Sequence, residues 1–141
     1  MHIRLTDQQI RDWEMVFPEA VQRGLEAAIP EVRSLAEALT PRLTGELAGS
    51  IEVWSTEKGL TVRWGAPHAK YAEYGTVAHE ITPHGDYPLA WFRNGKWNFA
   101  YRVSHPGYEG WHFVQRVREA LMAIVHTLVE NAVLQAARGK V

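Results

Sequence analysis

The chain has 141 residues, of which 46% are hydrophobic, and 15 basic side chains nearly balance 16 acidic ones to give a formal net charge of −1. This length predicts a single domain, residues 1–141, that buries roughly 70% of the surface exposed by the unfolded chain. The near-neutral charge excludes a protein held on nucleic acid or an anionic membrane by bulk charge, and the lack of cysteine excludes disulfides, thiolate metal sites and cysteine nucleophiles.

The first third of the chain is expected to be helical. Thr6-Asp7-Gln8-Gln9 has the spacing of a capping box, which predicts a helix start at Thr6. Apolar residues then recur with a 3.6-residue period. Pro18 either kinks this helix or restarts it as a first-turn proline. Pro30 interrupts the hydrogen bonds but not the apolar stripe, so we expect a kink there, and the helix should end at Thr40, just before a proline.

The period changes to two from residue 50. Apolar residues alternate over 51–55 and 60–64, which predicts a β-hairpin with Gly59 as a left-handed turn residue. Pro67 then begins a short helix that Gly75 closes.

A second hairpin carries the strongest local signal. Leu89–Arg93 and Lys96–Val103 flank Asn94-Gly95, the preferred pair for a two-residue type I′ turn. Counting back from the turn puts Phe92 opposite Trp97. One face of this hairpin is aromatic and the other is polar, and two basic residues beside the turn indicate an exposed tip.

Residues 112–138 form the last predicted helix, which is apolar nearly all round. Such a helix must bury both sides, so we expect a neighbouring subunit to cover one of them. Its longest uninterrupted apolar run, Ala120–Val125, is far shorter than the ~20 residues of a membrane span, so we expect no membrane association. The candidate interface residues are Trp91, Trp97, Val125, Val129 and Val133.

The sequence does not favour catalysis. HEITPH resembles a zinc-protease motif, but its histidines, His79 and His84, are five residues apart and Pro83 opposes a helix. We interpret them as solvated or hydrogen-bonded. No serine lies in a nucleophile-elbow context and no glycine-rich phosphate loop is present. We therefore expect no enzyme activity, no cofactor and no metal.

Glu73 lies near the C-terminus of the short helix, where the helix dipole disfavours a negative charge. Arg42 or Lys70 could compensate for that charge. The alternative is an ordinary solvated glutamate.

Three signatures remain, TPRLTGELAGSI at 40–51, HAKYAEYGT at 68–76 and HPGYEGWHFVQRV at 105–117. They predict, in that order, a helix end followed by a strand, a short helix closed by glycine, and a turn that leads into a helix. Together they resemble the tail-component family of long-tailed bacteriophages typified by Hong Kong 97, over residues 30–125. Family members usually carry proline just before the aromatic residue that opens the last helix, whereas this chain has His112. The resemblance rests on a set of motif residues and implies that they act in assembly. They are Thr44, Gly45, Tyr71, Glu73, Gly75, Thr76, His105, Pro106 and Gly107.

The resemblance implies an α+β fold in which a long kinked N-terminal helix and a C-terminal helix pack on a mostly antiparallel sheet built from two hairpins. It implies a non-enzymatic virion protein, a tail-completion, head–tail joining or minor tail protein of the neck, assembled in the host cytoplasm. Its partners would be copies of itself in a ring, with six copies expected, and neck and tail proteins such as the tail tube or terminator and the head-completion protein. DNA would pass through the ring without specific binding. The alternative is a small protein-binding module, regulatory or of toxin–antitoxin type, that grips one partner with the aromatic hairpin.

Overall fold

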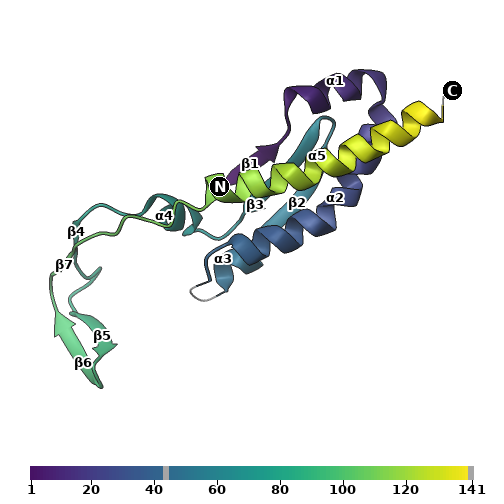
Figure 1. Ribbon diagram of the computed structural model, residues 1–141. Coiled ribbons are helices and arrows are strands. Elements are labelled where there is room, and N and C mark those ends of the chain that lie inside the picture. Colours follow the sequence, from purple (N-terminus) through teal and green to yellow (C-terminus); the bar gives the residue numbers. More distant parts are fainter. Residues whose placement is uncertain (43–44, 140–141) are drawn as a thin grey trace.

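A computed structural model describes residues 1–42 and 45–139, which form helices and antiparallel strands (Figure 1). The α+β prediction is confirmed. The helices are α1 (Gln8–Val16), α2 (Pro18–Leu39), α3 (Glu46–Gly49), α4 (Ala69–Tyr74) and α5 (Val114–Arg138). The strands are β1 (His2–Leu5), β2 (Ile51–Thr56), β3 (Gly59–Trp64), β4 (His79–Ile81), β5 (Leu89–Arg93), β6 (Lys96–Ala100) and β7 (Val103–His105).

The body of the molecule consists of two long helices on a three-stranded sheet. α2 and α5 lie side by side and the sheet, in the order β1-β3-β2, lies behind them (Figure 1). The helices approach closely at Gly24, where a β-carbon would stand only 2.7 Å from the Cα of Val129. Apolar side chains of both helices and of the sheet form one buried cluster. This burial is the main stabilising contribution to the body.

The N-terminal segment differs from its prediction. Asp7, not Thr6, caps α1, because its carboxylate accepts the amide hydrogen of Ile10 at 2.8 Å. The Thr6 hydroxyl instead donates to the carbonyl of Lys58 at 2.6 Å. The residues before it form β1, a strand that was not predicted. Of the two roles considered for Pro18, the structure has the restart, since α1 ends one residue before Phe17 and Pro18 opens α2.

The end of α2 follows the prediction. The helix runs without interruption through Pro30 and ends at Leu39, and Thr40 adopts an extended conformation before the proline. The Thr40 hydroxyl donates to the carbonyl of Ala36 at 2.6 Å and accepts the indole N–H of Trp64 at 3.0 Å. This buried pair ties the last turn of α2 to β3.

The two predicted hairpins form, but they belong to different sheets. The β2–β3 hairpin pairs with β1 in the body, whereas β5–β6 and β4–β7 are separate two-stranded ladders. The predicted strand Lys96–Val103 is divided, because Val103 leaves the hairpin and pairs with Ile81. Gly59 is not a left-handed turn residue. It pairs with Thr56, and its missing side chain lets the carbonyl of Leu5 come within 2.5 Å of the β-carbon position.

Candidate assembly site: the clasp and the arm

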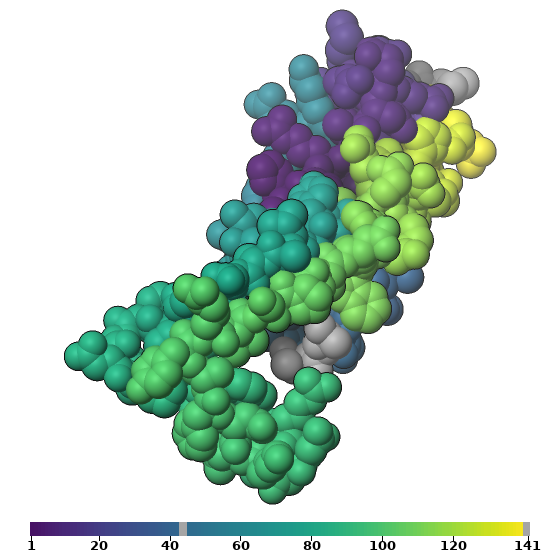
Figure 2. Space-filling view, turned by 90° about the vertical axis from the view of Figure 1, so that its left-hand side faces the viewer, coloured from purple at the N-terminus to yellow at the C-terminus, as the bar shows by residue number. Residues whose placement is uncertain are grey.

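The chain leaves the body after α4, runs outward and returns just before α5. We call the outward excursion, residues 77–106 with β4 to β7, the arm, and the junction formed by residues 71–76 and 107–114 the clasp. The arm projects from one end of the body, opposite the end that carries α1 and the C-terminus (Figures 1 and 2). Two of the three signatures in the sequence meet in the clasp.

Backbone hydrogen bonds hold the clasp together. The amide of Thr76 donates to the carbonyl of Tyr108 at 2.9 Å, and the amide of Tyr108 donates back at 3.0 Å. The Trp111 amide donates to the carbonyl of Ala72 at 2.8 Å, and the Tyr108 hydroxyl donates to the carbonyl of Tyr71 at 2.7 Å. The outgoing and returning segments therefore form one unit before the arm begins.

Two predicted glycines permit this close approach. Gly75 has φ of +78° and Gly107 has φ of +77°, a region that favours glycine. A β-carbon on Gly75 would collide with the carbonyl of Tyr108, and one on Gly107 would collide with the carbonyl of Thr76. The glycines of both signatures are thus required by backbone contacts between the two signatures.

Glu73 connects the clasp to α5. Its side chain is only 7% exposed, and Oε2 accepts the amide hydrogens of Phe113 at 2.8 Å and Val114 at 3.0 Å. These amides begin α5, whose own N-cap residue, Phe113, supplies no side-chain hydrogen bond. The carboxylate is therefore an N-cap supplied by another helix, and it also complements the α5 dipole.

This arrangement corrects the interpretation of Glu73. Its hydrogen-bond partners are amides of α5 rather than Arg42 or Lys70, and it is not solvated. Lys70 lies instead over the ring of Tyr71, 5.2 Å from the ring centre. The sequence carried one signal of the actual role, because α5 begins without a residue able to cap it.

His112 explains the departure from the family pattern. Its φ is +48°, whereas proline fixes φ near −65°. The His112 amide also donates to the carbonyl of Glu73 at 3.1 Å, a bond that proline could not make. In this chain the clasp geometry therefore excludes proline at position 112.

The remaining predicted motif residues are dispersed. His105 lies on β7, where its Nδ1 accepts the amide hydrogen of Gly107 at 2.9 Å and its ring stacks on His79 at 5.0 Å. Pro106 is exposed at the end of the arm, and Gly45 begins α3 with φ of +82°. Thr44 lies outside the described residues. Across residues 1–42 and 45–139, no three histidine or acidic side chains form a group that could hold a metal ion.

The arm exposes large aromatic side chains. The type I′ turn and the predicted register form, with Phe92 opposite Trp97 and positive φ at Asn94 and Gly95. The rings of Phe92 and Trp97 are 5.6 Å apart and meet edge to face at 67°. The aromatic side chains exposed on the arm are Tyr87, Trp91, Phe92, Trp97, Phe99 and Tyr101. The aromatic face of the hairpin therefore forms and is left uncovered by the subunit itself.

The valines of α5 differ from the aromatic residues in this respect. Val125, Val129 and Val133 are 0%, 0% and 6% exposed and belong to the core of their own subunit. Their proposed place at a subunit interface was wrong, because they form the stripe that faces α2. By length and composition alone α5 could cross a membrane, with a mean hydropathy of 1.4 over its most apolar 18 residues. One stripe of α5 packs in the buried core of the body, and 22% of those 18 residues are buried within the subunit.

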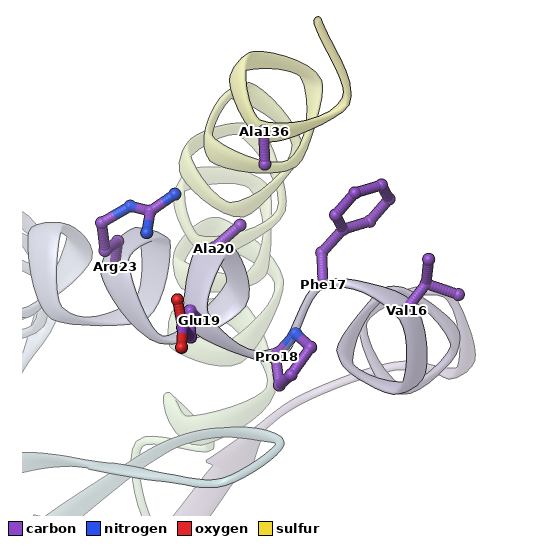
Figure 3. Close-up of a pocket in the computed structure, with 7 residues that line it drawn as sticks. All are labelled: Val16, Phe17, Pro18, Glu19, Ala20, Arg23 and Ala136. Atoms are coloured by element: carbon purple, nitrogen blue, oxygen red, sulfur yellow. The ribbon is translucent and has the colours of Figure 1, made fainter. Parts of the chain in front are cut away.

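A pocket lies at the corner between α1 and α2, far from the arm. Its lining residues are Val16, Phe17, Pro18, Glu19, Ala20, Arg23 and Ala136. Phe17 and Ala20 point toward the last turns of α5, where Ala136 faces them (Figure 3). Val16, one of these lining residues, is 63% exposed, and Met15, next to it in the chain, is 81% exposed. This corner pocket, lined by both apolar and charged side chains, lies at the opposite end of the molecule from the arm.

Comparison with known proteins identifies the family. A family model described as "Bacteriophage HK97-gp10, putative tail-component" matches residues 6–75. Over these residues the chain is similar to this family. No curated protein and no solved structure matches the chain.

The HK97-gp10 family is one of bacteriophage tail components, and the match confirms the resemblance seen in the sequence. The match begins at the N-terminus of α1 and ends at Gly75, inside the clasp. It covers α1, α2, α3, the β2–β3 hairpin and α4. The arm and α5 follow it.

Proposed function

We propose that the protein is a neck or tail-completion component of a long-tailed bacteriophage, whose copies form a ring that joins the tail to the head. Six copies are the expected number. Its other partners would be the tail tube or terminator and the head-completion protein, and it would enter the virion after assembly in the host cytoplasm. The role is mechanical, without turnover of a substrate.

The exposed aromatic arm is the observation that carries this proposal beyond a tail component in general. Phe92, Trp97 and Phe99 are 62%, 61% and 65% exposed. An isolated two-stranded hairpin is marginally stable in water, and aromatic residues are enriched where protein interfaces concentrate their binding energy. A subunit that presents such a hairpin on an arm anchored by the clasp is suited to contacts with neighbouring subunits.

The charge of the chain fits a ring around a DNA passage. A formal net charge of −1 gives no strong attraction for the DNA backbone. A lumen built from such subunits would let DNA pass without specific binding.

Electron microscopy of particles produced without this protein tests the proposal. We expect filled heads and free tails that remain separate, and intact joined particles when the gene is supplied in trans. Infectious, joined particles in its absence would overturn the joining role. That result, together with capture of one non-virion protein through the hairpin, would support the alternative of a small binding module.

A further inference from the structure

We propose that the tip of the arm of one copy docks into the corner pocket of a second copy. The occupant is the side-chain pair Phe92 and Trp97, which we call the knob, and the receptor is the pocket between α1 and α2. This inference rests on the proposed function and deepens it, because it names the contact by which copies join.

The knob is an apolar surface in need of a cover. Phe92 and Trp97 stand opposite each other beside the turn, in edge-to-face contact, with more than half of each side chain exposed. Each aromatic side chain can bury roughly 150–250 Å². Burying the pair would stabilise both the contact and the hairpin that presents it.

The corner pocket is an open hollow lined by apolar and charged side chains. Its volume is about 430 Å³, in the range of pockets that take a whole drug-sized ligand. Ala20 and Ala136 are small residues on its α2 and α5 sides, and Val16 and Phe17 line it from the end of α1 (Figure 3).

The charges around the two surfaces are complementary. The hairpin tip, residues 89–101, contains Arg93 and Lys96 and no acidic residue, a formal charge of +2. Glu19 and Arg23 line the pocket, and the segment that forms α1 and the start of α2, residues 7–23, contains four acidic residues and two arginines, a formal charge of −2. Opposite fields of this kind steer association and select the partner.

The geometry requires another copy. The hairpin lies at the opposite end of the molecule from α1 and the start of α2 (Figures 1 and 2), which line the pocket, so an arm extended as it is here does not reach its own pocket. A contact between two different surfaces is heterologous, and it generates a closed ring when the rotation between subunits permits.

Cysteine crosslinking of the full chain tests the contact, since the natural sequence has no cysteine to give a background. Lys96→Cys marks the tip and Val16→Cys marks the pocket. With a short bis-maleimide we expect the double variant to give a ladder of covalent oligomers. An equal mixture of the two single variants should give dimers only, because each protein then offers one reactive half of the contact.

The matched control pairs Lys96→Cys with Ser34→Cys, an exposed position farther along α2. We expect Trp97→Ala to lower the crosslinking yield of the tip–pocket pair about tenfold. Arg93→Glu should lower the yield as well, and adding Glu19→Arg to that variant should restore the yield. No ladder, an equal yield with the control position, dimers from Lys96→Cys alone, or no effect of Trp97→Ala would each overturn the inference.

The two proposals can fail separately. If the crosslinks are absent while particles made without the protein still fall into heads and tails, only the arm-to-pocket contact is wrong. If the crosslinks form and such particles remain joined, the copies assemble as proposed but do not join the tail to the head.

Discussion

Replacing Glu73 tests whether one carboxylate holds α5 to the clasp. The substitution Glu73→Ala removes the carboxylate that accepts the Phe113 and Val114 amide hydrogens. These two donors then lose their acceptor in a largely buried environment. Glu73→Gln keeps an oxygen acceptor of similar reach but removes the charge. The two variants therefore separate the hydrogen bonds from the interaction with the helix dipole.

The structure sets the size of the expected effects. A hydrogen bond to a charged group contributes about 1.5–3 kcal/mol. Both amides share one oxygen, Oε2, so their contributions do not add fully. We expect Glu73→Ala to lower the free energy of unfolding by about 3 kcal/mol. Glu73→Gln should lower it by about 1 kcal/mol, the size of a dipole interaction in a buried helix terminus.

Urea unfolding followed by far-ultraviolet circular dichroism measures both values. The matched control is Glu80→Ala on the arm, where the carboxylate is 57% exposed and lies 3.5 Å from Arg102. An exposed ion pair of this kind contributes less than about 1 kcal/mol. If Glu73→Ala costs no more than Glu80→Ala, the capping role assigned to Glu73 is refuted.

Three further outcomes are expected. Gly75→Ala should lower the unfolding temperature strongly, whereas Gly49→Ala should change it little, because a β-carbon there meets open space. Equal effects in thermal unfolding would contradict the contact assigned to the clasp. Gly24→Ala should destabilise by about 2 kcal/mol in urea unfolding despite the gain of about 1 kcal/mol in helix propensity, because its β-carbon would press on the backbone of α5. Brief trypsin digestion should cut first at Arg93 or Lys96 on the exposed hairpin and leave the body folded, as mass spectrometry and circular dichroism would report; first cuts within α2 or α5 would argue against this order of stability.

Local patterns in the sequence predicted the elements whose causes are local. The Asn94-Gly95 pair fixed the turn and register of the arm hairpin, and Thr40 before a proline marked the end of α2. β1 was missed because four residues next to a helix-capping sequence carry too short an alternation to recognise. Its pairing with β3 depends on a strand nearly sixty residues away.

The parts that failed depend on which surfaces meet. The apolar stripe of α5 indicated burial correctly but could not say whether α2 or a second subunit covers Val125. Glu73 and Phe113 are 40 positions apart, so no pattern of spacing joins the acceptor to its donor. The aromatic hairpin was predicted in register, yet its separation from the body sheet follows from the route of the chain through the clasp.

The clasp has a consequence for how such a protein diversifies. Two backbone hydrogen bonds join Thr76 and Tyr108. The chain between these residues is therefore a loop whose two ends already lie in contact. Lengthening, shortening or replacing that loop leaves the spacing of the scaffold unchanged.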